Sequence, residues 1–408
     1  MSDITEATVA LTGATSELRA AKESFELIRE DASKSINDVN ANFSEKVASL
    51  TITATAGYRN AVEKASGGRN TMILDDQGNE NIMVVVPRFN CDDINAAVLA
   101  ATGVDMQLGE GTHPAFRTNG VDRGEILVGK YLASSGDSGG CSVVGGVQPR
   151  VSVNYDTAKS LSVNKGENWH MMSMWEWAAI SLWSLANGTV PRGNTNYGRA
   201  HDMKHETALR ADGGMPGNTS GTGRTDTGSG PDKWAHDHGA FGIQDLVGNV
   251  WEWMDQMRLE DGRIITTLDN DPSIVEENWY KHGAYFDSTS DSQSGNAGSQ
   301  ILNSTITNRS GPIGDGSYDY GYNQNSLFSA IAKDDSYVEN EVLRRLLIES
   351  AGDTGLTGYL YSRNYGSRFP RRGGAWNSGS NAGLGALYLT GARSISYDSI
   401  GFRPALFV

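Results

Sequence analysis

Between Leu11 and Leu50, apolar or small side chains recur at alternating spacings of three and four residues, as on one face of an α-helix. A stripe this narrow cannot form a core alone, so the helix needs partners from other copies or from the globular part of the chain. The early part is heptad-like, and Phe25 to Leu50 repeats every eleven residues, which favours a straight or slightly right-handed supercoil. The positions are Leu11, Ala14, Leu18, Ala21, Phe25, Ile28, Ala32, Ile36, Val39, Phe43, Val47 and Leu50.

This pattern predicts a helical oligomerisation stalk, a coiled coil, over residues 1–65. The alternative is a single amphipathic helix that packs on its own domain. All nine tryptophans lie at or beyond Trp169 and no proline precedes Pro87, so the first third differs in composition from the rest. A domain boundary is therefore expected after the stalk.

The charge and the apolar content exclude several classes of partner. A formal net charge of −15 would repel DNA, RNA and anionic lipid. No apolar stretch reaches the ~18 residues that a membrane span needs, and Asp3 and Glu6 stand where a signal peptide would be basic. We expect no nucleic-acid partner, no membrane insertion and no signal peptide. Cys91 and Cys141 are the only cysteines, and we expect them to be buried free thiols.

Short β-prone runs follow the stalk and predict a β-rich connector domain over residues 66–163. Examples are residues 81–86 and 125–132, with Asp-, Gly- and Asn-rich turns between such runs. A third domain is expected over residues 164–408, which makes the chain α+β. It should begin with a largely buried helix over residues 168–186.

Two stretches of the third domain are predicted to be insertions outside the core. Residues 213–230 hold seven glycines and should form a mobile surface loop. Residues 260–365 include a Ser-, Asn-, Asp- and Gly-rich stretch at 283–326. Within them, Ser336 and Glu339 predict the capping box of a helix that continues to Gly352.

Three motifs occur in order: MWEWAA at 174–179, FGIQDLVGNVWEW at 241–253, and RGGAW at 372–376 with IGFR at 400–403. They resemble the formylglycine-generating enzyme family, whose members share a C-type-lectin-like fold. The resemblance covers residues 151–408, and the second motif is the most specific. It implies a C-type-lectin-like domain of the formylglycine-generating-enzyme type. We expect Arg393 and Arg403 to tie loops to carboxylates or carbonyls and not to contact a ligand.

The second motif also implies a metal site. In relatives that bind calcium at this loop, the ligands come from positions that match Asp245, Gly248, Val250 and Glu252, the middle two through carbonyl oxygens. Carboxylates with carbonyls suit a hard cation, so calcium is the cofactor expected, and no other. The alternative is that Asp245 and Glu252 cap or pair within the loop.

The enzymatic activity of the family is not expected here. Family enzymes oxidise a substrate cysteine with a pair of thiols, bound with copper, in the C-terminal block. No cysteine lies between Trp376 and Phe402, so we predict that the chain is not an enzyme. His201 with His205, and the run 236–238, have ligand-type groups, but nothing in the sequence brings the two clusters together, and surface histidines are the ordinary interpretation.

Residues 377–399 contain no Lys, Glu, Gln, Met or Trp, and small polar residues with occasional Tyr resemble an antibody paratope. The block also resembles the variable segment of lectin-fold proteins that retroelements diversify, among them tail-fibre receptor-binding proteins of bacteriophages. The alternative is a plain polar surface loop. The ligand-contacting positions implied are Asn377, Ser380, Asn381, Leu384, Tyr388, Thr390, Ser394, Ser396, Tyr397 and Asp398.

The resemblance and the stalk together predict a phage tail-fibre receptor-binding protein, made in the host cytoplasm and carried on the virion. Its expected partners are a host cell-surface receptor, either protein or glycan, and other virion tail proteins. Tail fibres suggest a homotrimer, in which several heads strengthen weak contacts through avidity. The alternatives are a cellular ligand-binding protein diversified by a retroelement and a structural tail component that binds only its virion neighbours.

Overall fold

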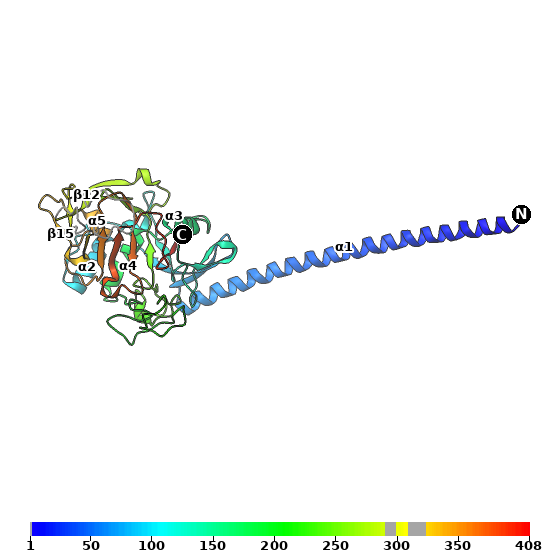
Figure 1. Cartoon of the computed structure of the whole chain (residues 1–408), viewed down its shortest axis with the longest axis horizontal. Coiled ribbons are helices and arrows are strands. Elements are labelled where there is room, and N and C mark those ends of the chain that lie inside the picture. The colour runs from blue at the N-terminus through cyan, green and yellow to red at the C-terminus, as the bar shows by residue number, and fades with distance from the viewer. Residues whose placement is uncertain (1, 290–298, 309–323) are drawn as a thin grey trace. The chain divides into compact units, whose positions relative to one another are not determined.

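The computed structural model describes residues 2–289, 299–308 and 324–408 of the chain. These residues form two compact units, residues 1–61 and 62–408. Figure 1 colours the chain from the blue N-terminal helix to the red C-terminal strands. None of the described helices is both long and apolar enough to cross a membrane.

The first unit is a single long helix, α1 (Ser2–Ser66), whose last residues enter the second unit. The helix predicted over residues 1–65 is therefore confirmed. Every side chain described from Arg19 to Lys46 is exposed, and Phe25 and Phe43 of the apolar stripe are 69% and 68% exposed. The stripe residues at 11, 14, 18, 47 and 50 lie outside the described side chains. Assembly of this helix into a coiled coil stays a prediction.

The first sheet of the second unit joins segments far apart in the sequence. The β-prone runs predicted at 81–86 and 125–132 are confirmed as the strands β2 and β5, and β21, near the C-terminus, lies between β5 and β8. The separate connector predicted over residues 66–163 is thus not seen: these strands share one sheet and one compact unit with the rest. The strand order is β1 (Asn70–Leu74), β2 (Glu80–Pro87), β5 (Glu125–Gly129), β21 (Pro404–Phe407) and β8 (Trp169–Met171).

Four strands of a second, six-stranded sheet lie within the segment predicted to be an insertion. Ile264, Phe286 and Leu302 on its strands are fully buried in the main hydrophobic core, so this segment is part of the core and that prediction is corrected. Residues 290–298 and 309–323 of the segment lie outside the described residues. The strand order is β15 (Ala332–Lys333), β13 (Gln300–Asn303), β12 (Tyr280–Ser288), β11 (Arg263–Thr266), β10 (Met257–Glu260) and β17 (Ser367–Arg368).

A third sheet carries parts of the second and third motifs. Successive side chains on a strand point to opposite faces, so the sheet has an inner and an outer face. Leu360 and Leu387 belong to the main core, whereas Tyr361 and Tyr388 pack with a second apolar cluster that includes Trp253. The strand order is β14 (Gln324–Leu327), β16 (Tyr359–Ser362), β19 (Gly383–Leu389), β18 (Arg371–Gly373), β9 (Trp251–Trp253) and β20 (Ile400–Phe402).

Helix α4 (Met174–Ala186) is buried on nearly all sides in the core. It begins later than predicted, because β8 occupies part of residues 168–173 and Ser173 caps the helix in a capping box with Glu176. Its indole groups are satisfied: Trp175 Nε1 donates to Thr267 Oγ1 at 2.9 Å, and Trp177 Nε1 to the Leu384 carbonyl at 2.9 Å. Residues of this helix belong to the same main hydrophobic core as residues of the three sheets.

Three further helices and two small hairpins complete the described elements that position the site. The helix predicted from the Ser336 capping box is shorter and is capped by Asn340 instead, while the Ser336 hydroxyl donates to Asp334 at 2.7 Å. The predicted loop at 213–230 is tied to Arg210, which donates to the carbonyls of Met215 and Ser220. The elements are α2 (Cys91–Thr102), α3 (Tyr155–Val163), α5 (Glu341–Arg345), β3 (Arg117–Thr118) with β4 (Val121–Asp122), and β6 (Ser134–Ser135) with β7 (Cys141–Ser142).

Candidate functional site

A pocket of about 330 Å³ opens on the outer face of the third sheet, and we call it the C-terminal pocket. Strands β9, β18 and β19 supply its floor, and the chain on either side of β19 supplies its rim. Four of the predicted ligand-contacting positions line it: Asn377, Tyr388, Thr390 and Tyr397. The other lining residues are Trp251, Arg371, Gly391, Ile395 and Ser399.

The remaining predicted positions do not line this pocket. Ser394, Ser396 and Asp398 are exposed between β19 and β20, and Asn381 is half-buried. Ser380 is exposed and lines another cavity of about 180 Å³, which His201 also lines.

The prediction for Leu384 is wrong. The residue lies on β19 with its side chain fully buried in the main core, so it cannot reach a ligand. The segment 377–399 looked like one polar loop, yet β19 (Gly383–Leu389) runs through its middle and turns alternate side chains inward.

Arg371 is the residue of this pocket that the sequence did not single out. It sits in β18 directly opposite Tyr388 on one neighbouring strand and Trp253 on the other. Its guanidinium carbon lies 4.4 Å from the centroid of the Tyr388 ring and 5.1 Å from that of Trp253. The Trp251 ring packs edge-on against Tyr388, with centroids 5.3 Å apart. The Arg371 guanidinium therefore packs against aromatic rings, and the faces of such rings attract a cation.

The Arg371 side chain is nevertheless a buried charge that protein groups do not neutralise. It is only 5% exposed, and among the described residues no hydrogen-bond acceptor reaches its Nε. No carboxylate of the described residues lines the pocket. Burial lowers the pKa of Arg371 to about 10, so the group remains charged at neutral pH.

Arg372, the next residue on β18, has different surroundings from Arg371. Its side chain points to the inner face and donates to the carbonyls of Leu346 at 3.1 Å and Leu347 at 2.9 Å. Burial lowers its pKa to about 9. The two adjacent arginines therefore serve different faces, because side chains alternate along a strand.

The prediction that Arg393 and Arg403 tie loops to carboxylates is confirmed. Arg403 makes two hydrogen bonds of 2.9 Å to the two oxygens of Glu252, and both side chains are fully buried. Arg393 pairs with Asp156 and Glu276 at the surface. These pairs fix β9 and the segment between β19 and β20, which both contribute to the C-terminal pocket.

The four residues proposed for calcium are arranged around other partners. Both Glu252 oxygens are taken by Arg403, and an Asp245 oxygen accepts from the Gly228 amide at 2.7 Å. Burial raises the pKa of Asp245 to about 6. A guanidinium beside Glu252 repels a cation, so Asp245, Gly248, Val250 and Glu252 as placed do not fit calcium. Calcium binding stays a prediction that calorimetry with a chelator would test.

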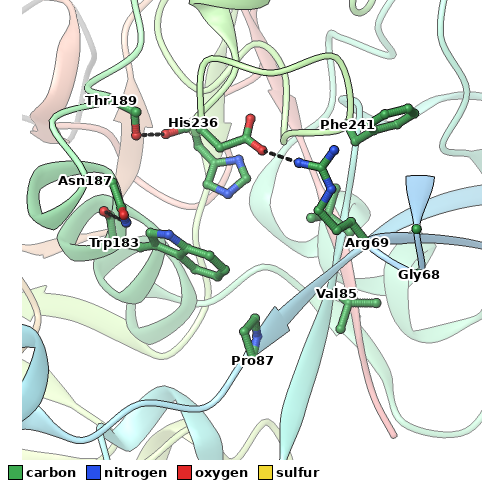
Figure 2. Close-up of a pocket in the computed structure, with 12 residues that line it drawn as sticks. Gly68, Arg69, Val85, Pro87, Trp183, Asn187, Thr189, His236 and Phe241 are labelled. Atoms are coloured by element: carbon green, nitrogen blue, oxygen red, sulfur yellow. Dashed lines mark hydrogen bonds and ion pairs between the residues drawn. The ribbon is translucent and has the colours of Figure 1, made fainter. Parts of the chain in front are cut away.

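A second cavity, of about 550 Å³, lies between α4 and the first sheet (Figure 2). His236, expected at the surface, is buried in its wall, where Nδ1 accepts from the Ile243 amide at 2.9 Å. Burial lowers the pKa of His236 to about 4, so the ring is neutral at neutral pH. Arg69 pairs with Asp237 at 3.5 Å on the same wall.

The described His, Cys, Asp and Glu side chains give no support to a metal site or to a reactive thiol. Within residues 2–289, 299–308 and 324–408, no three or more His, Cys, Asp or Glu side chains form a group that could hold a metal ion. Cys91 and Cys141 are buried free thiols, as predicted. Burial raises the pKa of both thiols, which disfavours the reactive thiolate.

No family model and no curated protein matches the chain. Similar solved structures include Treponema denticola variable protein 1, at 12% identity over 83% of this chain and 98% of that one, with a TM-score of 0.34. PvdO from Pseudomonas aeruginosa matches at 15% identity over 83% and 98%, with a TM-score of 0.32. The Major Tropism Determinant M1 variant matches at 12% identity over 83% and 71%, with a TM-score of 0.29. The sequence motifs resemble proteins of these kinds.

Proposed function

We propose that the chain is a non-enzymatic attachment protein, a phage tail-fibre receptor-binding protein that binds a host cell-surface receptor through the C-terminal pocket. The observation that carries this proposal is the gathering of Asn377, Tyr388, Thr390 and Tyr397 around one pocket. Their residue types suit recognition, because Tyr offers rigid contact area and Asn and Thr offer adaptable hydrogen bonds.

The pocket combines a fixed floor with a rim that can change, and this combination also suits a binding protein. Its floor consists of sheet residues held by the buried Glu252–Arg403 pair, whereas its rim consists of residues outside the strands. Side chains on the rim can change without disturbing the core, so one frame can carry many specificities. Diversification of residues 377–399 by a retroelement would use this property, and an adenine-rich near-copy of the coding segment in the genome would support it.

Helix α1 provides the second support for attachment. Its exposed apolar stripe suits assembly with other copies of the chain, and we propose a homotrimer mounted on other virion tail proteins. Several heads on one stalk raise the effective concentration of each site at a cell surface, so weak single contacts add up to firm attachment.

The test uses the full chain, labelled with a fluorophore, on a panel of bacterial strains. Asn377 is exposed at the pocket, so Asn377→Trp should block the pocket while the fold survives. Asn278→Trp is the matched control, since Asn278 is exposed on the same compact unit and does not line the pocket. We expect wild type and the control to stain the same strains, and Asn377→Trp to lose at least about tenfold in half-saturating concentration, as expected when contacts at a central pocket are lost.

Two outcomes contradict the proposal. Unchanged staining by Asn377→Trp places the receptor site elsewhere on the molecule. A wild-type protein that stains no strain, yet binds purified tail proteins, indicates a structural tail component.

A further inference from the structure

We propose that the C-terminal pocket recognises an acidic saccharide, a sugar unit that carries a carboxylate or a sulfate group, with Arg371 as the residue that binds the acid. This inference rests on the proposed function, because it assigns a ligand class to the same site. It follows from the charge, the burial and the walls of the pocket.

The first step is the unbalanced charge of Arg371. A buried cation costs free energy unless an anion or hydrogen-bond acceptors compensate for its lost hydration. The rings of Tyr388 and Trp253 offset a part of this cost, but rings do not accept the guanidinium hydrogen bonds in the plane of the group. Among the described residues the buried Nε donor has no acceptor, so the charge of this pocket-lining residue is left without full compensation.

The second step is the contrast with two other buried arginines near the third sheet, Arg372 and Arg403, which face its inner side. Arg372 donates from a terminal nitrogen to two backbone carbonyls, although its Nε also has no acceptor among the described residues, and Arg403 binds both oxygens of Glu252. Those two groups hold the fold together. Arg371 forms no ion pair with any described carboxylate, although the chain carries an excess of acidic residues that could have supplied one.

The third step is the fit between the groups of the pocket and those of an acidic sugar. A guanidinium is planar and presents its donors as a fork, which fits the paired oxygens of a carboxylate or a sulfate. The Trp251 and Tyr388 rings beside it offer flat apolar surfaces, and the Asn377 amide and Thr390 hydroxyl offer hydrogen bonds. A sugar ring needs both kinds of surface, and about 330 Å³ suits a ligand of small-molecule size.

The fourth step is selectivity. With a formal net charge of −15, the surface as a whole repels anions. An acidic saccharide would therefore bind where a cation lies within its reach, and Arg371 provides such a cation in the lining of the pocket.

Isothermal titration of the full chain at constant ionic strength tests this inference. The probes are sodium glucuronate, glucose 6-sulfate, glucose, sodium acetate and N-acetylaspartate. We expect glucuronate or glucose 6-sulfate, whichever acid the receptor carries, to bind at least about tenfold more tightly than glucose, the gain expected from charge-assisted hydrogen bonds. The same sugar should also bind more tightly than acetate.

Each other ranking contradicts the inference. Glucose binding as tightly as the acidic sugars would show that the acid is not recognised. Acetate binding as tightly as the acidic sugars would show an anion site without sugar recognition. N-acetylaspartate binding most tightly would point to a protein carboxylate as the ligand.

Variants test the role of Arg371. Arg371→Met should weaken binding of the acidic sugar at least about tenfold, because it removes the fork of donors. If that variant does not fold, Asn377→Asp serves instead: it keeps the size of an exposed lining residue and places a carboxylate at the pocket. Asn278→Asp, with the same charge change outside the pocket, is its control and should bind like wild type. Unchanged affinity in Asn377→Asp would overturn the inference.

The failure of this inference is distinguishable from the failure of the proposed function. A protein that stains bacterial strains but binds neither acidic sugar contradicts the ligand class alone. A protein that binds an acidic sugar and stains no strain contradicts the attachment function alone.

Discussion

Buried charged side chains around the third sheet are held in two ways, and the difference determines what each can do. Arg403 and Glu252 pair inside the protein through two hydrogen bonds of 2.9 Å, and Arg403 also donates to the carbonyls of Gly129 and Gln244. Arg371 lies on the opposite side of its strand from Arg372 and has no acidic partner among the described residues. The Glu252–Arg403 pair holds the strands of the pocket floor in place, whereas Arg371 remains available to a ligand.

The buried Glu252–Arg403 ion pair gives a prediction for stability. Arg403→Met leaves the Glu252 carboxylate buried without a partner, so the free energy of unfolding should fall by about 3–5 kcal/mol. The double variant Arg403→Met with Glu252→Leu should recover much of this loss, since neither charge remains. Urea unfolding measures both, and Arg393→Met, which breaks a partly exposed pair, should cost no more than about 1 kcal/mol. Equal losses in the two single variants would contradict this prediction.

Sequence reasoning found part of the site at this scale. The resemblance to a variable segment, together with residue types typical of binding surfaces, indicated Asn377, Tyr388, Thr390 and Tyr397. They could not identify Arg371, since its role depends on the strand boundaries, which decide whether Arg371 or Arg372 faces outward. The same missing boundary placed Leu384 wrongly among the contact residues.

Among the elements, α4 shows how local signals and tertiary packing combine. Its apolar pattern predicted a buried helix, but the three residues of β8 (Trp169–Met171) were assigned to it because an apolar run before a helix has no period of its own. The cap at Ser173 marks the true start. Glu176, the other half of the capping box, also accepts from His170 and from Asn270, so the cap joins three segments.

This cap predicts a measurable loss of stability. Ser173→Ala removes the hydroxyl that accepts from the Glu176 amide, and the free energy of unfolding should fall by about 1–2 kcal/mol. Ser181→Ala is a matched control on the same buried helix, because the Ser181 hydroxyl donates only within the helix, to the Trp177 carbonyl. It should cost distinctly less. Similar losses for both in urea unfolding would show that the cap does not stabilise the helix start.

At the scale of the whole molecule, the sequence predicted the long helix and the α+β character but not the joining of its segments. The connector and the insertion were inferred from composition, and neither is a separate body in the structure. Pairing between β5 (Glu125–Gly129) and β21 (Pro404–Phe407) spans most of the second unit, and no local pattern encodes such a contact. Helices α2 and α3 were missed because their short apolar runs lie among turn residues.

The stripe on α1 gives a prediction for assembly. Ala32 lies on the stripe and Ala41 on the opposite side of the helix, and both are exposed. Ala32→Asp should shift the full chain toward monomer, because it buries a charge in the helix interface, whereas Ala41→Asp should leave the assembly intact. Sedimentation equilibrium gives the mass of each. A wild-type monomer, or equal behaviour of the two variants, would contradict the predicted trimer.

The place of β21 in the first sheet has a consequence for biosynthesis. It lies between β5 and β8, so the interior of that sheet stays open on a ribosome until residues 404–407 have emerged. Arg403, which closes the ion pair with Glu252, emerges in the same moment. Stop codons that remove even this short stretch should therefore yield chains that quality-control proteases degrade.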